Sequence, residues 1–402
     1  MDSPAPVLAR RESYFRPSPV RAVFETAMRP DVVSLAGGNP DLSFLPHSLI
    51  ADLTADLLAQ RGEDILQYGS GAGTDAAREL SAELMRWAGA PRSVPEIQMT
   101  SGSQAGLDAV TKLLCDPGDV IIAEGPTYVG VLGTFGAYEA DVRQVPLDED
   151  GLDPQAVAEA IDQVQAEGRK VAFVYTITAY QNPSGRCLNP ARYEDLIEVC
   201  ARRGVLLVED DAYGLLGFGT VPETRRPALA SVSAEQVIHL GSYSKIFSPG
   251  ARVGWISAPV PLRERLQVAC ESVCITPSVL AQELVTAYVG TPAWREGLAA
   301  QLAAYEDRCQ AAVAAVRTHL PAEVTYHVPA GGFFLWLSLP ESVAAPGVDV
   351  LELGLREKVV VIPGSGCYVG LEPGTHARLA FSAVGAETID DGVARLARAL
   401  NS

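Results

Sequence analysis

Short apolar runs alternate with amphipathic, helix-like stretches through the middle of the chain. The expected strands are residues 97–99, 120–123, 141–145, 171–176, 205–209, 237–240 and 253–258, with helices over 106–114, 155–166 and 191–203. Strands that alternate with helices predict an α/β layer built on a mostly parallel sheet, here of seven strands. In such sheets ligands bind beyond the carboxyl ends of the strands, so polar residues at those ends are the first candidates for a site.

The pattern changes after about residue 277. An alanine-rich helical region is followed by short strand-like runs and a closing helix; these segments are 279–320, 323–327, 333–337, 359–362, 377–382 and 386–400. They predict a smaller α+β domain. We expect residues 46–280 to form a large domain, and residues 1–45 and 281–402 to form the small domain together.

Composition and charge narrow the possible functions. The chain has 402 residues, of which 48% are hydrophobic and 20% are charged, and its net charge is −18. The length favours two globular domains. Nucleic-acid binding needs basic patches, and the chain has no such Lys/Arg cluster, so we expect no nucleic-acid partner. No apolar run is long enough to span a membrane and the N-terminus lacks a signal-peptide core, so we expect a cytoplasmic protein without a membrane partner.

The cysteines give no sign of a disulfide framework or a metal site. There are seven, an odd number, and none forms a CxxC pair. This pattern favours reduced thiols. Cys270 and Cys274 have helical i, i+4 spacing, but no histidine or second cysteine pair accompanies them, so we expect no metal there.

One segment carries a candidate for covalent chemistry. An apolar run, 237–240, is followed by Ser242, Ser244 and Lys245, and then by Arg252. A lysine at a strand end can form a Schiff base with an aldehyde, and the hydroxyls and guanidinium beside it can hold a phosphate. Pyridoxal phosphate (PLP) carries both groups. Taken alone, the segment is equally compatible with a loop that has a solvated lysine and a helix-capping arginine.

Two further strand ends carry candidates for a cofactor site. Ser103 and Gln104 follow a short strand and open an apolar-periodic helix, where Ser103 as the N-cap and the exposed amides would form an anion site. The alternative is an ordinary strand-to-helix turn. Tyr128 follows the strand at 120–123 and could stack on a flat ring, although core packing is the commoner role of such a tyrosine.

The remaining candidates combine amide, carboxylate and guanidinium groups. Asn182 lies in an Asn-Pro-Ser-Gly turn, and Asp210 is the middle of three acids that end the run at 205–208. Adjacent residues on a strand point to alternate sides, so these acids cannot easily share a metal, whereas a buried cation such as a pyridinium would suit one of them. Arg378 lies on an alternating segment, where it could bind a carboxylate through two parallel hydrogen bonds or form an edge-strand ion pair.

These signals occur in an order that resembles a known family. The motifs are residues 34–40 (SLAGGNP), 67–69, 101–104, 126–128, 181–185, 209–214, 242–245 with Arg252, 331–336, and Arg378. In this order they are similar to fold-type I PLP-dependent enzymes, and within these to the class I/II aminotransferases that include 2-aminoadipate and aromatic aminotransferases. The resemblance covers about residues 30–400.

The resemblance implies a role for each matching residue near the cofactor ring. Lys245 would hold PLP as an internal aldimine and then act as the acid and base of the proton shift. Asp210 would pair with the pyridine nitrogen. Asn182 and Tyr213 would hydrogen-bond the ring's phenolic oxygen, and Tyr128 would stack on the ring.

It also implies how the phosphate and the substrate are bound. The phosphate would lie among Ser103, Gln104, Ser242, Ser244 and Arg252, and Tyr68 would reach the phosphate of the neighbouring subunit in a homodimer with shared active sites. Arg378, with Asn182 and Gly38, would bind the substrate α-carboxylate. The implied activity is transfer of an amino group between an L-amino acid and a 2-oxo acid.

Some positions depart from the family pattern and keep alternatives open. Residues 175–180, Thr74 and Cys367 replace residue types that are common in relatives, and they are expected to line or support the substrate pocket. The alternative is a PLP enzyme of another reaction class, such as β- or γ-elimination, replacement, or carbon–carbon bond formation, with S-adenosylmethionine as one conceivable substrate. A second alternative, a sensor fused to a DNA-binding module, is disfavoured because only some 30 residues precede Ser34, fewer than the roughly 50 of a small domain. Side chains that could meet a substrate from the N-terminal segment are Tyr14, Phe15, Arg16, Arg21, Phe24 and Arg29.

Overall fold

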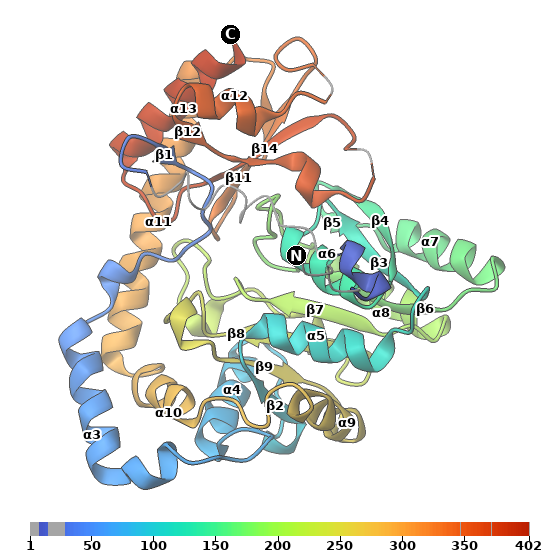
Figure 1. The fold of residues 1–402 in the computed structure, drawn as a ribbon, viewed down its shortest axis with the longest axis vertical. Helices are drawn as coiled ribbons and strands as arrows, with labels where there is room; N and C mark the ends of the chain where they lie inside the picture. Colours follow the sequence, from blue (N-terminus) through green and yellow to red (C-terminus); the bar gives the residue numbers. More distant parts are fainter. Residues whose placement is uncertain (1–7, 15–28, 346, 371, 402) are drawn as a thin grey trace, which may run out of the picture.

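The computed structural model describes residues 8–14, 29–345, 347–370 and 372–401. A large mixed sheet with its helices forms the lower part of the molecule in Figure 1, and a second, smaller sheet lies above it. The two are connected by one long helix, α11 (Pro292–His319), which runs along one side of the molecule.

The large sheet confirms the predicted α/β layer and adds one strand to it. Its order is β2 (Ile97–Thr100), β9 (Gly254–Ser257), β8 (Val237–Ser242), β7 (Leu207–Asp211), β6 (Val171–Thr176), β3 (Val120–Gly125), β4 (Asp141–Asp148) and β5 (Gly151–Leu152). Strands β8, β7, β6, β3 and β4 are parallel, while β9 runs antiparallel to both of its neighbours. The prediction of seven strands was one short, because β5 is only two residues long and has no periodicity to detect.

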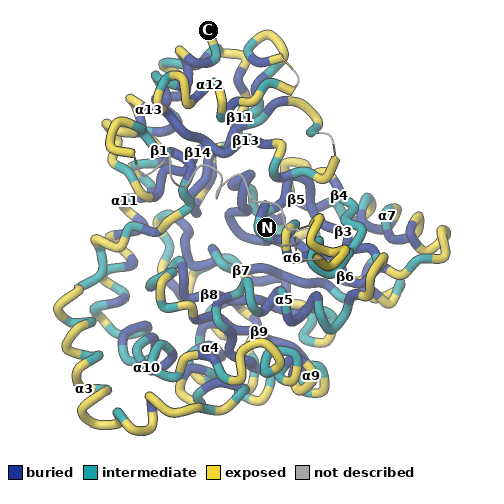
Figure 2. Tube along the Cα trace, viewed as in Figure 1, coloured by how far each residue is buried: buried dark blue, intermediate teal, exposed yellow. Residues whose placement is uncertain are grey.

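Helices cover both faces of this sheet, so its central strands have no solvent-exposed residues. Every residue of β3, β6, β7 and β8 is buried, as expected for parallel strands covered on both faces. The tube in Figure 2 shows these strands as largely buried segments, whereas the helices around them contain intermediate and exposed residues as well. The helices of this part are α3 (His47–Ile65), α4 (Asp75–Trp87), α5 (Ser103–Leu114), α6 (Val129–Ala137), α7 (Pro154–Ala166), α8 (Tyr193–Arg202), α9 (Val260–Glu271) and α10 (Val279–Tyr288).

The smaller part is α+β, as predicted. Its antiparallel sheet has the order β10 (Thr325–Tyr326), β11 (Phe334–Leu339), β14 (Thr375–Ala380) and β13 (Ile362–Pro363). A separate pair joins β1 (Val33–Ser34) to β12 (Val359–Val360), so the start of the chain is anchored to the C-terminal part. Helices α12 (Val350–Arg356) and α13 (Ala386–Leu400) pack with α11 around these strands.

One expectation about this part needs correction. The helical region 279–320 is divided at 289–291, because Thr291 caps a new helix through Trp294 N and Pro292 occupies its first position, where a proline is tolerated only at a helix start. The assignment of residues 1–45 to the small domain stays a prediction, but the described residues 10–14 also contact the large part. The short 3-10 helix Arg10–Tyr14 lies against α6 of the large sheet, and Arg10 forms an ion pair with Glu139.

The division into domains at residues 46 and 280 stays a prediction. The N-terminal end of α11 contacts the large part of the molecule: Trp294 Nε1 donates a hydrogen bond to Ile246 O, in the loop after β8, at 2.8 Å. No helix in the described part of the chain is long and apolar enough to cross a bilayer.

Candidate active site

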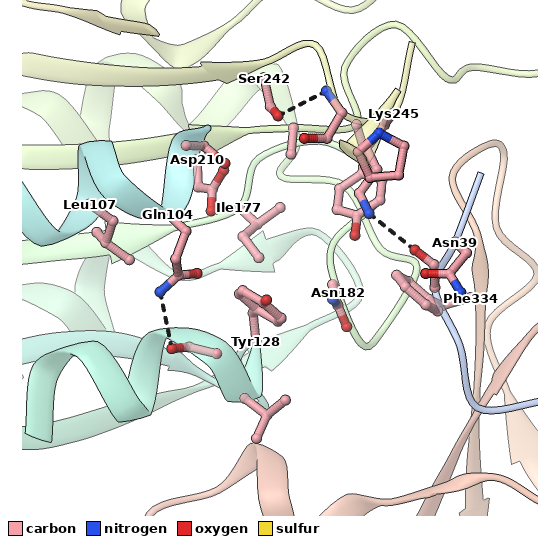
Figure 3. Close-up of a pocket in the computed structure, with 18 of the residues that line it drawn as sticks. Asn39, Gln104, Leu107, Tyr128, Ile177, Asn182, Asp210, Ser242, Lys245 and Phe334 are labelled. Atoms are coloured by element: carbon pink, nitrogen blue, oxygen red, sulfur yellow. Dashed lines mark hydrogen bonds between the residues drawn. The ribbon is translucent and has the colours of Figure 1, made fainter. Parts of the chain in front are cut away.

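A cavity of about 320 Å³ opens where the carboxyl ends of β7 and β8 and the loops after β3 and β6 face the small sheet (Figure 3). It contains every residue predicted for the site except Tyr68. Its lining residues are Gly38, Asn39, Ser103, Gln104, Leu107, Tyr128, Val129, Gly130, Ile177, Asn182, Asp210, Ala212, Tyr213, Ser242, Ser244, Lys245, Pro249, Arg252, Phe334 and Arg378.

Lys245 lies just beyond β8 with its side chain directed into this cavity. Its Nζ donates to Gly38 O at 3.0 Å, and none of the carboxylates among the described residues forms an ion pair with it. Burial, together with the charges of Arg378 and Arg252 and against the effect of Asp210, lowers the pKa of Lys245 to about 8. A buried amine with a lowered pKa is a good nucleophile toward an aldehyde.

Asp210 lines the cavity, and one of its carboxylate oxygens is buried without a partner among the described residues. Tyr175 Oη donates to Asp210 Oδ2 at 2.8 Å, whereas Oδ1 is buried and has no hydrogen-bond partner among the described residues. Burial raises the pKa of Asp210 to about 6. An unpaired buried oxygen of this kind costs free energy, which a cationic N–H donor would recover.

The two neighbouring acids point to the other side of β7, as the strand alternation predicts. Glu209 Oε2 lies 3.0 Å from His239 Nδ1, and its side chain also accepts from Leu229 N and Ala230 N. Asp211 pairs with Arg225. The three acids therefore do not converge, and the described residues contain no cluster that could hold a metal ion.

The start of α5 is a candidate anion site. Gly102, with φ +83°, caps this helix, so the prediction that Ser103 is the N-cap was wrong; Ser103 is the first helical residue. The left-handed backbone at Gly102 favours glycine, and a Cβ there would lie 2.4 Å from Arg252 Nη2. The guanidinium therefore lies beside Gly102 at the start of the helix, where the first amides have no partner within the helix.

None of the polar groups around this candidate site contacts a carboxylate of a described residue in the hydrogen bonds that follow. Arg252 donates to Pro249 O and Ser101 O, and it forms no ion pair with a described residue. Ser242 Oγ accepts from Ser244 N at 3.1 Å, which fixes both serines at the end of β8. Gln104 Nε2 donates to Thr134 Oγ1 at 2.6 Å, so its amide is turned toward α6.

Three uncharged polar side chains complete the floor of the cavity. Tyr128 caps α6 and Asn182 lies in the loop after β6; both line the cavity and are labelled in Figure 3. Tyr213 follows β7, and burial raises its pKa even though a hydrogen bond with Asn182 lowers it. These phenol and amide groups can hydrogen-bond or stack on a planar ligand.

Arg378 is a buried cation on β14 without a counter-ion. It is 2% exposed and forms no ion pair with a described residue, so the edge-strand ion pair considered above is absent; β14 also has neighbours on both sides. Its Nη1 donates to Asn182 Oδ1 at 2.8 Å and its Nη2 to Ala36 O at 2.7 Å, while Nε has no partner. The Phe334 ring lies 4.3 Å from the guanidinium, which stabilises the charge without using its N–H groups.

Tyr68 is the predicted site residue that does not reach the cavity. It is 75% exposed, on the segment between α3 and α4. Of the N-terminal candidates, Phe15, Arg16, Arg21 and Phe24 lie outside the described residues, Tyr14 is exposed, and Arg29 pairs with Asp31.

The positions that depart from the family pattern have different locations. Ile177 lines the cavity and Tyr175 supports Asp210. Cys367 is buried behind the wall, where its carbonyl accepts from Thr127 N at 2.9 Å. Thr74 does not line the cavity but caps α4 through Ala77 N.

Two residues that matter to the site were missed as site residues in the sequence. Tyr175 was noted only as a departure from the family pattern, although its hydroxyl orients Asp210. Phe334 was noted only as part of a motif. The two aromatic residues after the Gly331-Gly332 pair, Phe333 and Phe334, were the available signal, since glycines before a strand permit close packing.

The residues present fit PLP. The unpartnered Asp210 Oδ1 can accept from a pyridine N–H, the α5 start with Arg252 can bind a phosphate dianion, and Lys245 can react with an aldehyde. The fold and this site define a fold-type I PLP-dependent enzyme.

The comparisons with known proteins identify the family. The model of the family "Aminotransferase class I and II" matches residues 30–396, and the chain belongs to this family. It is 33% identical to aromatic-amino-acid aminotransferase 1 of Thermococcus litoralis, over 95% of this chain and 91% of that protein.

Solved structures agree with this. A kynurenine aminotransferase of Pyrococcus horikoshii, crystallised with PMP, has a TM-score of 0.89 at 30% identity, over 98% of this chain and 96% of that one. The α-aminoadipate aminotransferase LysN of Thermus thermophilus, complexed with N-(5′-phosphopyridoxyl)-L-leucine, has a TM-score of 0.87 at 30% identity, over 98% and 97%. The protein is a PLP-dependent aminotransferase, and the alternative reaction classes are not favoured.

Proposed function

We propose that this aminotransferase carries out its reaction with Lys245, Asp210, Asn182 and Tyr213 as catalytic residues and Arg378 as the carboxylate-binding residue. The observation that carries the proposal is that one cavity is lined by a buried amine, a carboxylate with one unpartnered oxygen and a buried guanidinium without an anion. Each lacks the partner that a PLP cofactor or an amino-acid substrate would supply.

Bound PLP would supply an aldehyde that takes up the amino group and a ring that accepts the electron pair released at Cα. Lys245 Nζ would take the proton from Cα of the amino acid and deliver it to the former aldehyde carbon. Asp210 Oδ1 would accept a hydrogen bond from the ring nitrogen and keep that nitrogen protonated. One amine in a fixed position, which acts first as the base and then as the acid, would account for this proton transfer.

The remaining assignments concern binding. Tyr128 would cover one face of the ring, and Asn182 and Tyr213 would hydrogen-bond its phenolic oxygen. The α-carboxylate of the substrate would lie on Arg378 next to Gly38. The phosphate would be bound by Ser103, Gln104, Ser242, Ser244 and Arg252.

Gly38 has a steric role in this arrangement. A Cβ on this residue would lie 2.5 Å from the Phe334 ring. The absence of a side chain lets the residue 36–38 backbone approach Arg378 and Lys245 and accept from both, through Ala36 O and Gly38 O.

The proposed active unit is a homodimer in which Tyr68 reaches the phosphate site of the other subunit. Leu66, Tyr68, Val273 and Ile275 are all more than 60% exposed, and Gly69 lies directly against Val279. The segments 66–69 and 273–279 therefore form one exposed apolar surface, and such surfaces favour a protein partner. A cytoplasmic location is proposed as well, because all seven cysteines are free.

Substrates of the relatives suggest where to begin with this protein. Their names cover aromatic amino acids, kynurenine and 2-aminoadipate. The first amino donors to test are therefore L-amino acids with aromatic or long side chains, and the first acceptors are 2-oxo acids.

A half-reaction on the purified holoenzyme tests the assignment of Lys245. Each amino acid is added without an acceptor, and we expect loss of the visible absorbance of the lysine-bound cofactor with release of one equivalent of 2-oxo acid. Lys245→Ala should lack this absorbance and lose at least about a thousand-fold in rate. A Lys245→Ala protein that keeps both would show that another lysine binds the cofactor.

Subunit mixing tests the proposed dimer. Tyr68→Phe should weaken cofactor binding, and hybrid dimers with Lys245→Ala should regain a high-affinity site, since one site then has both residues. A monomer in sedimentation, or no recovery in the mixture, would show that Tyr68 acts elsewhere.

A further inference from the structure

Glu124 is a buried carboxyl group that does not line the active-site cavity. It lies at the penultimate position of β3 and is 1% exposed. Its side chain accepts from Thr176 Oγ1 at 2.8 Å, from Ile177 N at 3.0 Å and from Gln181 Nε2 at 3.0 Å. All three partners belong to the end of β6 and the loop after it, so Glu124 joins two neighbouring strand ends.

Gln181 extends this connection in both directions along the chain. Its Nε2 also donates to Pro126 O at 2.8 Å, and its Oε1 accepts from Ser184 N at 2.7 Å. Pro126 precedes Tyr128 by two residues, and Ser184 follows Asn182 by two residues. The Glu124–Gln181 pair therefore ties the loop that carries Tyr128 to the loop that carries Asn182.

Keeping a carboxyl group at this place is costly. Burial raises the pKa of Glu124 to about 8, against the effect of its three hydrogen bonds. An apolar core residue would avoid that cost, so packing alone does not account for a carboxyl group here. What the carboxyl group contributes is direction, because hydrogen bonds fix the relative position of two loops more narrowly than apolar contact does.

We infer that Glu124 and Gln181 form a positioning pair that sets the places of Tyr128 and Asn182 in the active site. Neither residue of the pair lines the cavity, so each acts through the loops and not by contact with the reacting atoms. The inference rests on the proposed roles of Tyr128 and Asn182. It means that the residues that would contact the cofactor ring are themselves positioned by a pair of residues behind them.

The variants that test the pair differ in the hydrogen bonds they retain. Glu124→Leu and Gln181→Leu remove the connection with little change in volume. Glu124→Gln is the conservative variant, because its carbonyl oxygen can accept from Ile177 N and Gln181 while its NH₂ donates to the Thr176 hydroxyl after that group turns. Glu283→Leu is the control, since Glu283 is also a buried acid, paired with Arg61 at 2.6 Å and outside the cavity.

Cofactor binding to the apoenzyme and the visible circular dichroism of the bound cofactor are measured for each variant. We expect Glu124→Leu and Gln181→Leu to weaken PLP binding on the order of tenfold and to change the dichroism, which reports how the ring is oriented. Glu124→Gln should stay near wild type. Glu283→Leu should lower the melting temperature and leave both cofactor readouts unchanged.

A mutant cycle separates positioning from general stability. In a Tyr128→Leu/Asn182→Ala background, Glu124→Leu should weaken PLP binding no further, because the groups it positions are gone. A further tenfold loss there, or an unchanged affinity in the single Glu124→Leu variant, would overturn the inference. If Tyr128→Leu and Asn182→Ala alone leave PLP affinity unchanged, the proposed roles of those two residues fail instead.

Discussion

The cofactor side and the carboxylate side of the active site are built in different ways. The cofactor side consists of strand ends of the large sheet and of the first turns of the helices that follow them, all within one mostly parallel sheet and its helices. The carboxylate side consists of Arg378 and Phe334 on the small sheet and of the backbone at 36–38, which come from distant parts of the chain.

The two sides also differ in how they hold charge. Asp210 is oriented by Tyr175 and keeps one free oxygen, whereas Arg378 is held by two neutral acceptors and an aromatic face. The first side is therefore prepared for a cation and the second for an anion. An enzyme that keeps one cofactor through many turnovers while exchanging substrates benefits from this separation, because a change on one side need not affect the other.

Asp210→Asn would break the cofactor side. The amide keeps the shape but cannot hold the ring nitrogen protonated, so we expect kcat to fall by about 100- to 1000-fold. The loss should be the same for every amino donor, since all use the same ring. Steady-state kinetics with several donors checks this, and a loss confined to one donor would contradict the assignment.

Arg378→Lys would break the carboxylate side. A lysine keeps the charge but loses the planar fork, so we expect KM for amino acids to rise by roughly 10- to 100-fold. The half-reaction of the corresponding amine, which has no carboxylate, should not change. Equal losses for the amino acid and the amine would mean that Arg378 acts on the cofactor side.

Much of the cofactor side could be predicted from the sequence, and the reason is local. The apolar run before Glu209 ends in acids, and the run before Ser242 ends in hydroxyls and a lysine. The polar residues of the site therefore follow directly after recognisable strands in the sequence. The Tyr175–Asp210 bond could not be predicted, because it depends on the β6–β7 register, in which Tyr175 is opposite Val208.

Less of the carboxylate side could be predicted from the sequence, because its contacts also depend on strand register. Arg378 was found as an isolated arginine on a strand, but its neighbours depend on the antiparallel register that pairs Trp336 with Arg378 and Phe334 with Ala380.

On the cofactor side, Gly102 was missed as the cap of α5, since a serine follows it and serine is the commoner capping residue. Long-range register and left-handed backbone are set by packing, not by local pattern.

Lys245 lies between the two sides, and its titration would sharpen the comparison. Burial and the charges of Arg378 and Arg252 together lower its pKa from 10.5 to about 8. The reactive form is the neutral amine, so PLP uptake by the apoenzyme should accelerate about tenfold per pH unit below 8 and level off above it. Stopped-flow absorbance checks this. Arg378→Leu should move the midpoint upward, and a wild-type midpoint near 10 would contradict a buried lysine.

Phe334→Leu is the mildest way to disturb the carboxylate side. The variant removes the aromatic face 4.3 Å from the Arg378 guanidinium but leaves both of its hydrogen bonds. Because a cation–π contact contributes about 0.5–2 kcal/mol, KM for amino acids should rise by roughly 2- to 30-fold with little change in kcat.

The control for this variant is Phe218→Leu, the same substitution at a partly buried ring that packs on Phe381 and does not line the cavity. It should lower the melting temperature without raising KM. In an Arg378→Leu background, Phe334→Leu should add no further rise in KM, because the cation it supports is absent. A full additional rise would show that Phe334 contacts the substrate side chain directly, which would extend the carboxylate side into a specificity pocket.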